Sequence, residues 1–325
     1  MYLYTLCVEK LKILNKIMCG RTVLSLGKDE VRCACSYKSN NESYYTKPQW
    51  LPEHNAGKDY TPSHNIAPTD VTPVLVSSTR FKCGQNYNRI LKPMMWGIIP
   101  PWHKGNYKTH NMSTNNCRIE NIKNSKLYSP LLYNGGRCII VVEGFYEWQT
   151  TNKLSKMKQP YYIYSQQNEN VKVDEPDTWK NTYSEEGGWK GIKLLYMAGL
   201  YSMWQDGETT IYSYSVITME SNQTLDWLHH RMPAILSSEE QIEAWLDIDN
   251  VKPEVALSYL KPVEILLSHP VSSIVNNSRN KSVICNKKVT KDTKTPQKTL
   301  DSFFTKVEKR KLTDANNVDS KRVKK

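Results

Sequence analysis

The sequence predicts an α+β fold, and three observations support this prediction. Short runs rich in apolar and β-branched residues, flanked by turn-forming residues, recur along the chain and are typical of strands. Helical patterns are few and come late. Strands and helices also do not alternate regularly, as they would in a parallel α/β fold. The predicted strands are residues 71–76, 137–142, 161–164, 194–201 and 211–219.

The best-defined helices follow these strands. Ser238 and Gln241 have the spacing of a capping box, which predicts a helix over residues 239–246. Pro253 suits the first turn of a second helix, over residues 254–260. The remaining predicted elements are a helix over 220–228, a polar loop over 39–64, an inserted surface loop over 168–191 and two short apolar runs at 264–267 and 271–275.

Charge is unevenly distributed along the 325 residues, of which 39% are hydrophobic, enough for a sizeable core in one large domain or two small ones. The net charge is +12, but residues 281–325 contain 14 Lys and Arg against 5 Asp and Glu, which is +9. The first 280 residues therefore carry only +3. A basic tail is typical of proteins that bind nucleic acid or an acidic partner, or that carry a nuclear signal. Any DNA site in the globular part must depend on a local basic patch.

The eight cysteines include no C-x-x-C pair, and Cys33 and Cys35 lack a second Cys or His pair at zinc-ligand spacing. We therefore expect free thiols in a reducing compartment, with no metal and no cofactor. No apolar run reaches the roughly 20 residues of a membrane span, and lysines interrupt the apolar positions of residues 1–17, so we expect neither an anchor nor a secretory signal. Residues 1–17 could form an amphipathic helix, or could be absent from the working protein, because Met18 offers a second start.

The first of four reactive segments is MCGRT at residues 18–22. Removal of Met18 would leave Cys19 with a free α-amine beside its thiol. Because such an amine has a pKa of about 8, a useful fraction is neutral at physiological pH. It can form an imine with an aldehyde, and the thiol can then close a thiazolidine ring. The alternative is a cysteine buried in a strand.

Three further segments carry polar groups suited to a reactive site. Residues 115–118, NNCR, offer an amide to orient a reacting group and an arginine to hold a phosphate, or simply a turn beside a surface arginine. Residues 143–148, EGFYEW, place carboxylates among aromatic residues at a strand end, where burial would raise the pKa; an exposed strand glutamate is the alternative. Residues 229–233, HHRMP, contain two histidines, which titrate near neutral pH. Adjacent histidines should point apart, so a shared metal ion is not expected.

Together these segments resemble the SRAP family (SOS-response-associated peptidase-like proteins) over residues 18–285. The matching stretches are MCGRT at 18–22, HNIAPTD at 64–70, MMWGIIPPW at 94–102, NNCR at 115–118, RCIIVVEGFYEW at 137–148, MAGLY at 197–201, LHHRMPAIL at 228–236 and VSSIVNNSRN at 271–280. The resemblance implies a mainly antiparallel, curved, barrel-like β-sheet core with a few flanking helices. A disordered tail is expected from residue 286. Family members bind single-stranded DNA and join an N-terminal Cys to the ring-opened aldehyde of an abasic site, which shields the lesion.

The family's catalytic residues match Cys19, Asn116, Glu147 and His229. The resemblance implies that the amine of Cys19 attacks C1′ of the sugar and that its thiol closes the ring. Glu147 would assist proton transfer, His229 would act as acid or base near the deoxyribose oxygens, and Asn116 would orient the adduct. By motif position, the DNA-contacting residues are Arg21, Asn65, Trp96 and Arg118.

This chain departs from the family pattern at its beginning, since family members start at Met-Cys. Here 17 residues precede Met18. If they persist, Cys19 has no free amine and cannot form a thiazolidine. We favour an internal start at Met18 over a cleavage that exposes Cys19.

The tail contains QKTLDSFF at residues 297–304, which resembles the box that binds the sliding clamp PCNA. In such a box one helical turn inserts apolar side chains into a pocket while the glutamine hydrogen-bonds beside it. The partner-binding residues would be Gln297, Leu300, Phe303 and Phe304. The alternative is a chance apolar cluster. Residues 309–311 and 321–322 resemble a bipartite nuclear signal, or a basic tail that touches DNA non-specifically. We expect a nuclear monomer.

Three functions compete at this stage. The first is an enzyme that crosslinks itself to abasic sites in single-stranded DNA during the replication-coupled damage response, with lyase activity as an extension. The second is a thiol peptidase that cleaves itself before Cys19, using the same side chains. The third is a non-catalytic reader of modified DNA, which would survive loss of Cys19.

Overall fold

The computed structural model describes residues 20–38, 42–81, 88–151, 158–264 and 266–289. Cys19 and residues 1–17 therefore lie outside the described residues. The predicted clamp-binding box at 297–304 and the nuclear signal also lie outside them. Predictions about these segments stay predictions.

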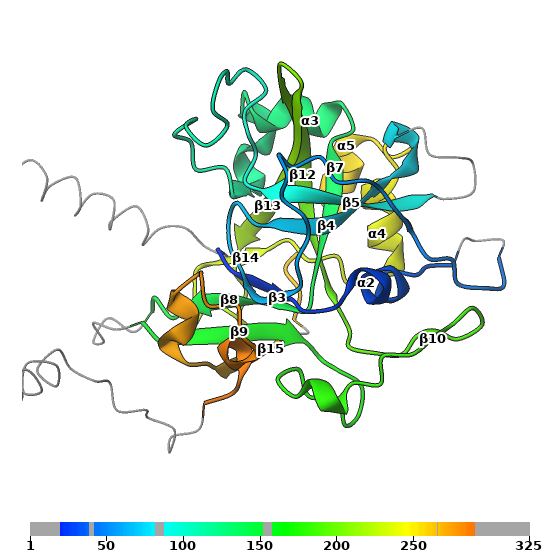
Figure 1. Cartoon of the computed structure of the whole chain (residues 1–325), viewed down its shortest axis with the longest axis vertical. Coiled ribbons are helices and arrows are strands. Elements are labelled where there is room, and N and C mark those ends of the chain that lie inside the picture. Colours follow the sequence, from blue (N-terminus) through cyan, green and yellow to red (C-terminus); the bar gives the residue numbers. More distant parts are fainter. Residues whose placement is uncertain (1–19, 39–41, 82–87, 152–157, 265, 290–325) are drawn as a thin grey trace, which may run out of the picture. The chain divides into compact units, whose positions relative to one another are not determined.

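Five strands close into a barrel (Figure 1): β4 (Val71–Ser77), β5 (Arg89–Trp96), β7 (Arg137–Val142), β12 (Leu195–Asp206) and β13 (Thr209–Glu220). Neighbours in the order β5-β4-β7-β12-β13 pair antiparallel. The ring closes where Met95 and Trp96 of β5 run parallel to Ser213 and Tyr214 of β13. The predicted α+β fold with a mainly antiparallel, barrel-like core is confirmed.

A second sheet of five antiparallel strands has the order β15 (Leu266–Pro270), β9 (Pro160–Ser165), β8 (Gly144–Trp148), β1 (Thr22–Leu24) and β3 (Ser63–Ile66). One residue, Glu143, separates β7 of the barrel from β8 of this sheet. The N–H of Glu143 donates to the carbonyl oxygen of Val23 in β1 at 2.8 Å. Gly144 is required next, because a Cβ there would lie 2.5 Å from the carbonyl oxygen of Ile163. The chain thus passes from the barrel to the second sheet within two residues.

The remaining elements are short. The other strands are β2 (Gln49–Trp50), β6 (Asn116–Arg118), β10 (Tyr183–Ser184), β11 (Gly188–Trp189) and β14 (Arg231–Pro233). The α-helices are α2 (Lys28–Ala34), α3 (Tyr128–Tyr133), α4 (Glu239–Leu246) and α5 (Pro253–Ser258). The 3-10 turns are η1 (Ser78–Phe81), η2 (Ile119–Asn124), η3 (Pro176–Thr178), η4 (Ser273–Asn276) and η5 (Val283–Asn286). Helix α4 has its predicted bounds and its predicted capping box, since Ser238 Oγ accepts from the N–H of Gln241 at 3.3 Å.

The helix expected over residues 220–228 is wrong. Strand β13 continues to Glu220, and residues 223–228 form turns instead. The side chain of Asn222 stabilises these turns, because its oxygen accepts from the N–H of Thr224 at 3.2 Å and its amide donates to the carbonyl oxygen of Val263 at 3.0 Å. An asparagine that bonds to nearby backbone in this way competes with helix formation.

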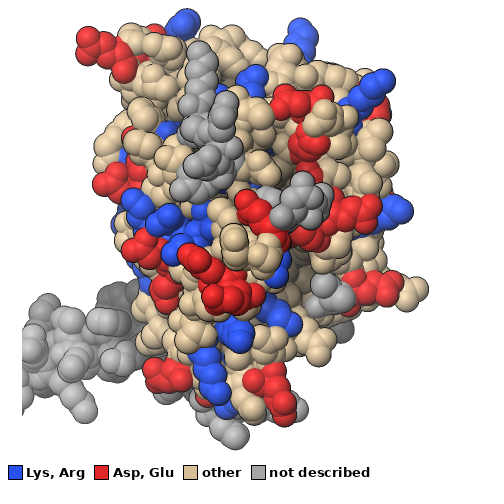
Figure 2. All heavy atoms as spheres, turned by 90° about the vertical axis from the view of Figure 1, so that its right-hand side faces the viewer, with Lys and Arg blue, Asp and Glu red and all other residues tan. Residues whose placement is uncertain are grey.

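Figure 2 shows acidic and basic side chains interspersed over the right-hand face of the molecule as drawn in Figure 1. The mixture agrees with the small net charge of residues 1–280. Within the described ranges, no helix is long and apolar enough to cross a membrane.

Candidate active site

All four reactive segments of the sequence contribute to one cavity of about 340 Å³. It lies where the beginning of β1, the end of β8 and the turn after β13 come together. Its lining residues are Gly20, Arg21, Pro68, Asn115, Glu147, Trp148, Thr150, Lys158, His229 and Asn276. The fold therefore gathers polar and charged groups that are distant in the sequence.

Glu147 reaches the cavity from β8. It is only 5% exposed, and its carboxylate accepts a hydrogen bond from the backbone N–H of Trp148 at 3.3 Å. Its direct neighbour across the sheet is Tyr161 of β9. A nearly buried carboxylate that faces a cavity is suited to accept or deliver a proton there.

His229 lines the cavity from the turn after β13 and is 4% exposed. Its Nδ1 accepts a hydrogen bond from the backbone N–H of Arg231 at 3.1 Å, which assigns the proton of the neutral ring to Nε2. Burial lowers the pKa of His229 to about 4, and the positive charges of His230, Lys158 and Arg231 add to this effect. At neutral pH the side chain is therefore an uncharged imidazole that donates from Nε2.

The two adjacent histidines do not point apart, contrary to our expectation. The rings of His229 and His230 stack with centroids 4.4 Å apart and an angle of 29° between planes. Among the described residues, no group of three or more His, Cys, Asp or Glu side chains could hold a metal ion.

The motif position predicted that Asn65 contacts DNA, but its side chain is not exposed. It is fully buried, and its amide donates to the carbonyl oxygens of Val275, Asn277 and Asn280 at 2.9–3.2 Å. Its side-chain oxygen accepts from the guanidinium of Arg21 at 3.2 Å. Asn65 thus holds the loop after β15 against the beginning of β1.

Arg21 is partly engaged within the protein. Its guanidinium also donates to the carbonyl oxygen of Val275 at 2.6 Å and lies over the ring of Trp148 at 5.9 Å. Burial lowers the pKa of Arg21, and the negative charge of Asp70 opposes that effect. Because Arg21 still lines the cavity, it brings positive charge to its wall.

Trp96 does not offer the stacking face that we expected. It is 1% exposed, and its ring stacks on Tyr214 inside the barrel with centroids 6.2 Å apart. Its indole N–H donates to the carbonyl oxygen of Asn115 at 3.0 Å. Trp96 therefore acts on the cavity by fixing the backbone of a lining residue.

The NNCR segment contributes to the cavity through Asn115. Asn116 lies beside it at the start of β6, half-buried, and pairs in register with Val216 of β13. Arg118, at the end of the same short strand, is exposed. It remains accessible to a phosphate, although it is not among the residues that line the cavity.

Glu143 is a buried carboxylate that sequence reasoning did not single out from its neighbours. Its oxygens accept from the backbone N–H of Ser25 at 2.6 Å, the N–H of Leu26 at 3.2 Å and the hydroxyl of Ser25 at 2.9 Å. Burial raises the pKa of Glu143 to about 7, although these donors oppose the shift. The carboxylate fixes the segment that follows β1, and so helps to hold the beginning of β1 at the cavity.

The Glu143→Gln variant should change how stability depends on pH. Between pH 4.5 and about 7 the folded protein holds the Glu143 proton that the unfolded chain has lost, so stability falls as pH rises. The difference in unfolding free energy between wild type and variant should therefore fall by about 3 kcal/mol from pH 4.5 to pH 8. Urea unfolding across this range measures it. Exposed Glu208→Gln is the control, and a constant difference for Glu143→Gln would contradict the expectation.

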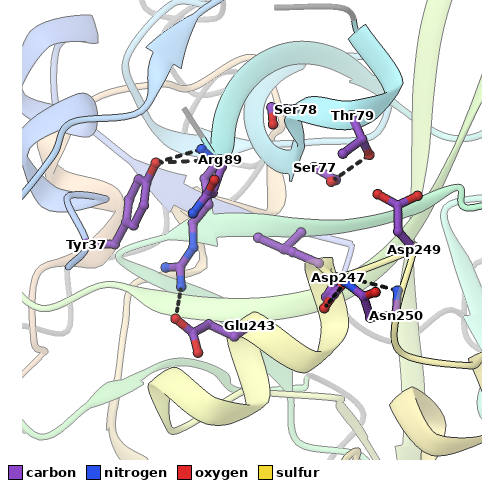
Figure 3. A pocket seen from close by; sticks show the side chains of 11 residues that line it. Tyr37, Ser77, Ser78, Thr79, Arg89, Glu243, Asp247, Asp249 and Asn250 are labelled. Carbon is purple, nitrogen blue, oxygen red and sulfur yellow. Dashed lines mark hydrogen bonds and ion pairs between the residues drawn. The ribbon is translucent and has the colours of Figure 1, made fainter. Parts of the chain in front are cut away.

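A second cavity, of about 370 Å³, lies between Tyr37, β5 and α4 (Figure 3). Its Arg89 stacks on the ring of Tyr37 at 4.6 Å and pairs with Glu243 at 3.6 Å and with Glu239. Asp247 and Asp249 add further negative charge to its wall. Since phosphates would be repelled there, the cavity that contains Glu147 and His229 is the better candidate for binding nucleic acid.

Comparison with known proteins gives one family. Residues 18–278 match the model of the SOS response associated peptidase (SRAP) family. The protein named Abasic site processing protein HMCES of Xenopus tropicalis is 39% identical, over 82% of this chain and 77% of the relative. The protein of the same name from Pongo abelii is 37% identical, over 82% of this chain and 75% of the relative.

Among solved structures, a protein from Bacteroides thetaiotaomicron aligns with a TM-score of 0.57 and 22% sequence identity. The alignment covers 84% of this chain and all of that protein. This likeness shows that the two chains share a fold.

Proposed function

Because the chain belongs to the SOS response associated peptidase family, we propose that it processes abasic sites in DNA. The relatives named Abasic site processing protein support this proposal. The substrate would be single-stranded DNA. The cavity of the protein is large enough to admit a sugar that has lost its base.

The chemistry would be formation of a covalent adduct at Cys19. The α-amine of Cys19 attacks C1′ of the ring-opened sugar, and loss of one water gives an imine. The thiol then adds across the C=N bond, its proton passes to the nitrogen, and a thiazolidine results. Glu147 would accept and return protons at the amine, while neutral His229 donates from Nε2 to a sugar oxygen.

One observation carries this proposal: Gly20 lines the same cavity as Glu147 and His229. Cys19 is the residue directly before Gly20 in the sequence. The proposed reactive residue is therefore the sequence neighbour of a residue that lines the cavity containing Glu147 and His229.

Intact-mass measurement tests the proposal. The protein beginning at Cys19 and the chain beginning at Met1 are each incubated with a single-stranded oligonucleotide that contains one abasic site. We expect the first to gain the mass of the oligonucleotide less one water, and the second to gain nothing. The matched control is an oligonucleotide whose abasic aldehyde has been reduced to an alcohol. No gain by the Cys19 form, or a gain with the reduced oligonucleotide, would overturn the mechanism.

Other functional predictions rest on segments outside the described residues. Binding of the sliding clamp through Gln297, Leu300, Phe303 and Phe304 would recruit the protein to replicating DNA, and the basic tail would direct it to the nucleus. The monomeric state and the lyase activity also remain proposals.

Autopeptidase activity before Cys19 would use the same cavity. It would be observed as conversion of the form that begins at Met1 to the form that begins at Cys19.

A further inference from the structure

Trp227 is an exposed aromatic residue beside the candidate active site. It is 37% exposed, and it belongs to the turn that also presents His229 to the cavity. Its ring meets the ring of Tyr161 edge to face, with centroids 5.0 Å apart and an angle of 85° between planes. Tyr161 is the cross-strand neighbour of Glu147. The contact with Tyr161 therefore links Trp227 to the strand pair that carries the catalytic carboxylate.

The backbone around Trp227 is hydrogen-bonded to the residues that follow β8. The hydroxyl of Thr151 donates to the carbonyl oxygen of Trp227. The N–H of Thr150, a cavity-lining residue, donates to the carbonyl oxygen of Leu228 at 2.9 Å. These bonds limit the movement of the turn's backbone, beside Thr150 and His229, which both line the cavity.

The indole N–H of Trp227 is already used, because it donates to the carbonyl oxygen of Thr224 at 2.8 Å within the same turn. What remains for a ligand is the exposed part of the aromatic ring, which suits stacking rather than hydrogen-bond recognition. Lys158, which is exposed and lines the cavity, adds positive charge nearby. A stacking face beside basic side chains is how proteins hold single-stranded nucleic acid without reading its sequence.

We propose that Trp227 forms a base-stacking subsite for the nucleotide next to the abasic site. This proposal rests on the proposed function, since it assigns the neighbouring base of the same DNA strand. With the lesion sugar in the cavity, one flanking base stacks on the indole and fixes the position of the sugar. Stacking accepts any base, so purines, which have the larger face, should bind more tightly than pyrimidines.

Binding is measured with an oligonucleotide carrying a tetrahydrofuran abasic analogue, which has no aldehyde and cannot form the adduct. A fluorescent 2-aminopurine is placed on one flank or the other. We expect wild type to quench its fluorescence on one flank only. Trp227→Leu should remove this quenching and weaken binding at least about fivefold, whereas Trp227→Phe should retain most of both. Exposed Tyr44→Ala is the matched control and should behave as wild type.

A second arm separates this subsite from the reaction itself. With the aldehyde-bearing oligonucleotide at saturating concentration, Trp227→Leu should form the adduct more slowly than wild type but to the same final extent, because the stacked base positions the sugar and takes no part in the reaction. Wild-type affinity and quenching in Trp227→Leu would overturn the subsite while leaving the proposed function intact. Failure of wild type itself to form an adduct would instead overturn the proposed function.

Discussion

Replacing Cys19 with alanine, in the protein that begins at residue 19, is expected to abolish the stable adduct with abasic DNA. The variant keeps an α-amine, so it can still form an imine with the aldehyde, but it has no thiol to close the ring. An imine in water hydrolyses, and therefore little adduct should survive denaturing electrophoresis.

Borohydride makes this prediction specific. Reduction during the reaction converts an imine into a stable amine, so Cys19→Ala should be trapped with borohydride and lost without it. The control is Cys33→Ala, which removes a half-buried thiol elsewhere and should leave the adduct unchanged. An adduct of Cys19→Ala that persists without reductant would refute thiazolidine formation. Loss of trapping as well would mean that the variant fails to present its amine.

The second large effect is expected for Glu147→Gln. Glutamine keeps the shape of the side chain but cannot take up a proton, so each proton transfer at the amine loses its positioned acceptor. A general acid or base contributes about 10²- to 10⁴-fold to a rate, and we expect a loss of that order in the single-turnover rate of adduct formation.

Affinity distinguishes this loss from a damaged cavity. Binding of the tetrahydrofuran oligonucleotide should be nearly unchanged in Glu147→Gln, because the glutamine side chain has the shape of glutamate and the backbone of the strand is unaltered. Exposed Glu208→Gln should change neither quantity. A Glu147→Gln variant that reacts at the wild-type rate would remove Glu147 from the mechanism.

Local patterns predicted the regular parts of the fold well. The β-branched run at 137–142 and the capping box at Ser238 have direct local causes, and both elements form with the predicted bounds. Strand β5 was not predicted, because Arg89, Lys92 and Pro93 interrupt its apolar pattern. Strand β5 is buried because the barrel closes, and a short stretch of sequence does not reveal this long-range pairing.

The same limit explains the errors at the site. Motif position grouped Trp96 and Asn65 with residues that contact DNA, but both are buried. They act on the site through hydrogen bonds to the lining residues Asn115 and Arg21. The turn that leads to the stacked histidines was missed because Asn222, which stabilises it, bonds to Val263, and these two residues come together only in the folded chain. By contrast, the grouping of the four segments into one site was implied by their joint resemblance to the family, since single segments also allowed ordinary structural roles.

The span of sequence that builds the cavity also sets the order of events during synthesis. Its wall begins at Gly20 and ends at Asn276, and the barrel beside it closes only when β13 meets β5. In the form proposed to begin at Cys19, a nascent chain would therefore carry an N-terminal thiol and amine long before Glu147 and His229 are in place. During translation the terminus can react with stray cellular aldehydes only at the uncatalysed rate of a free cysteine. The proposed reactivity toward DNA would thus arise only with completion of the domain, and delayed folding would prolong the period in which small aldehydes could inactivate such a chain.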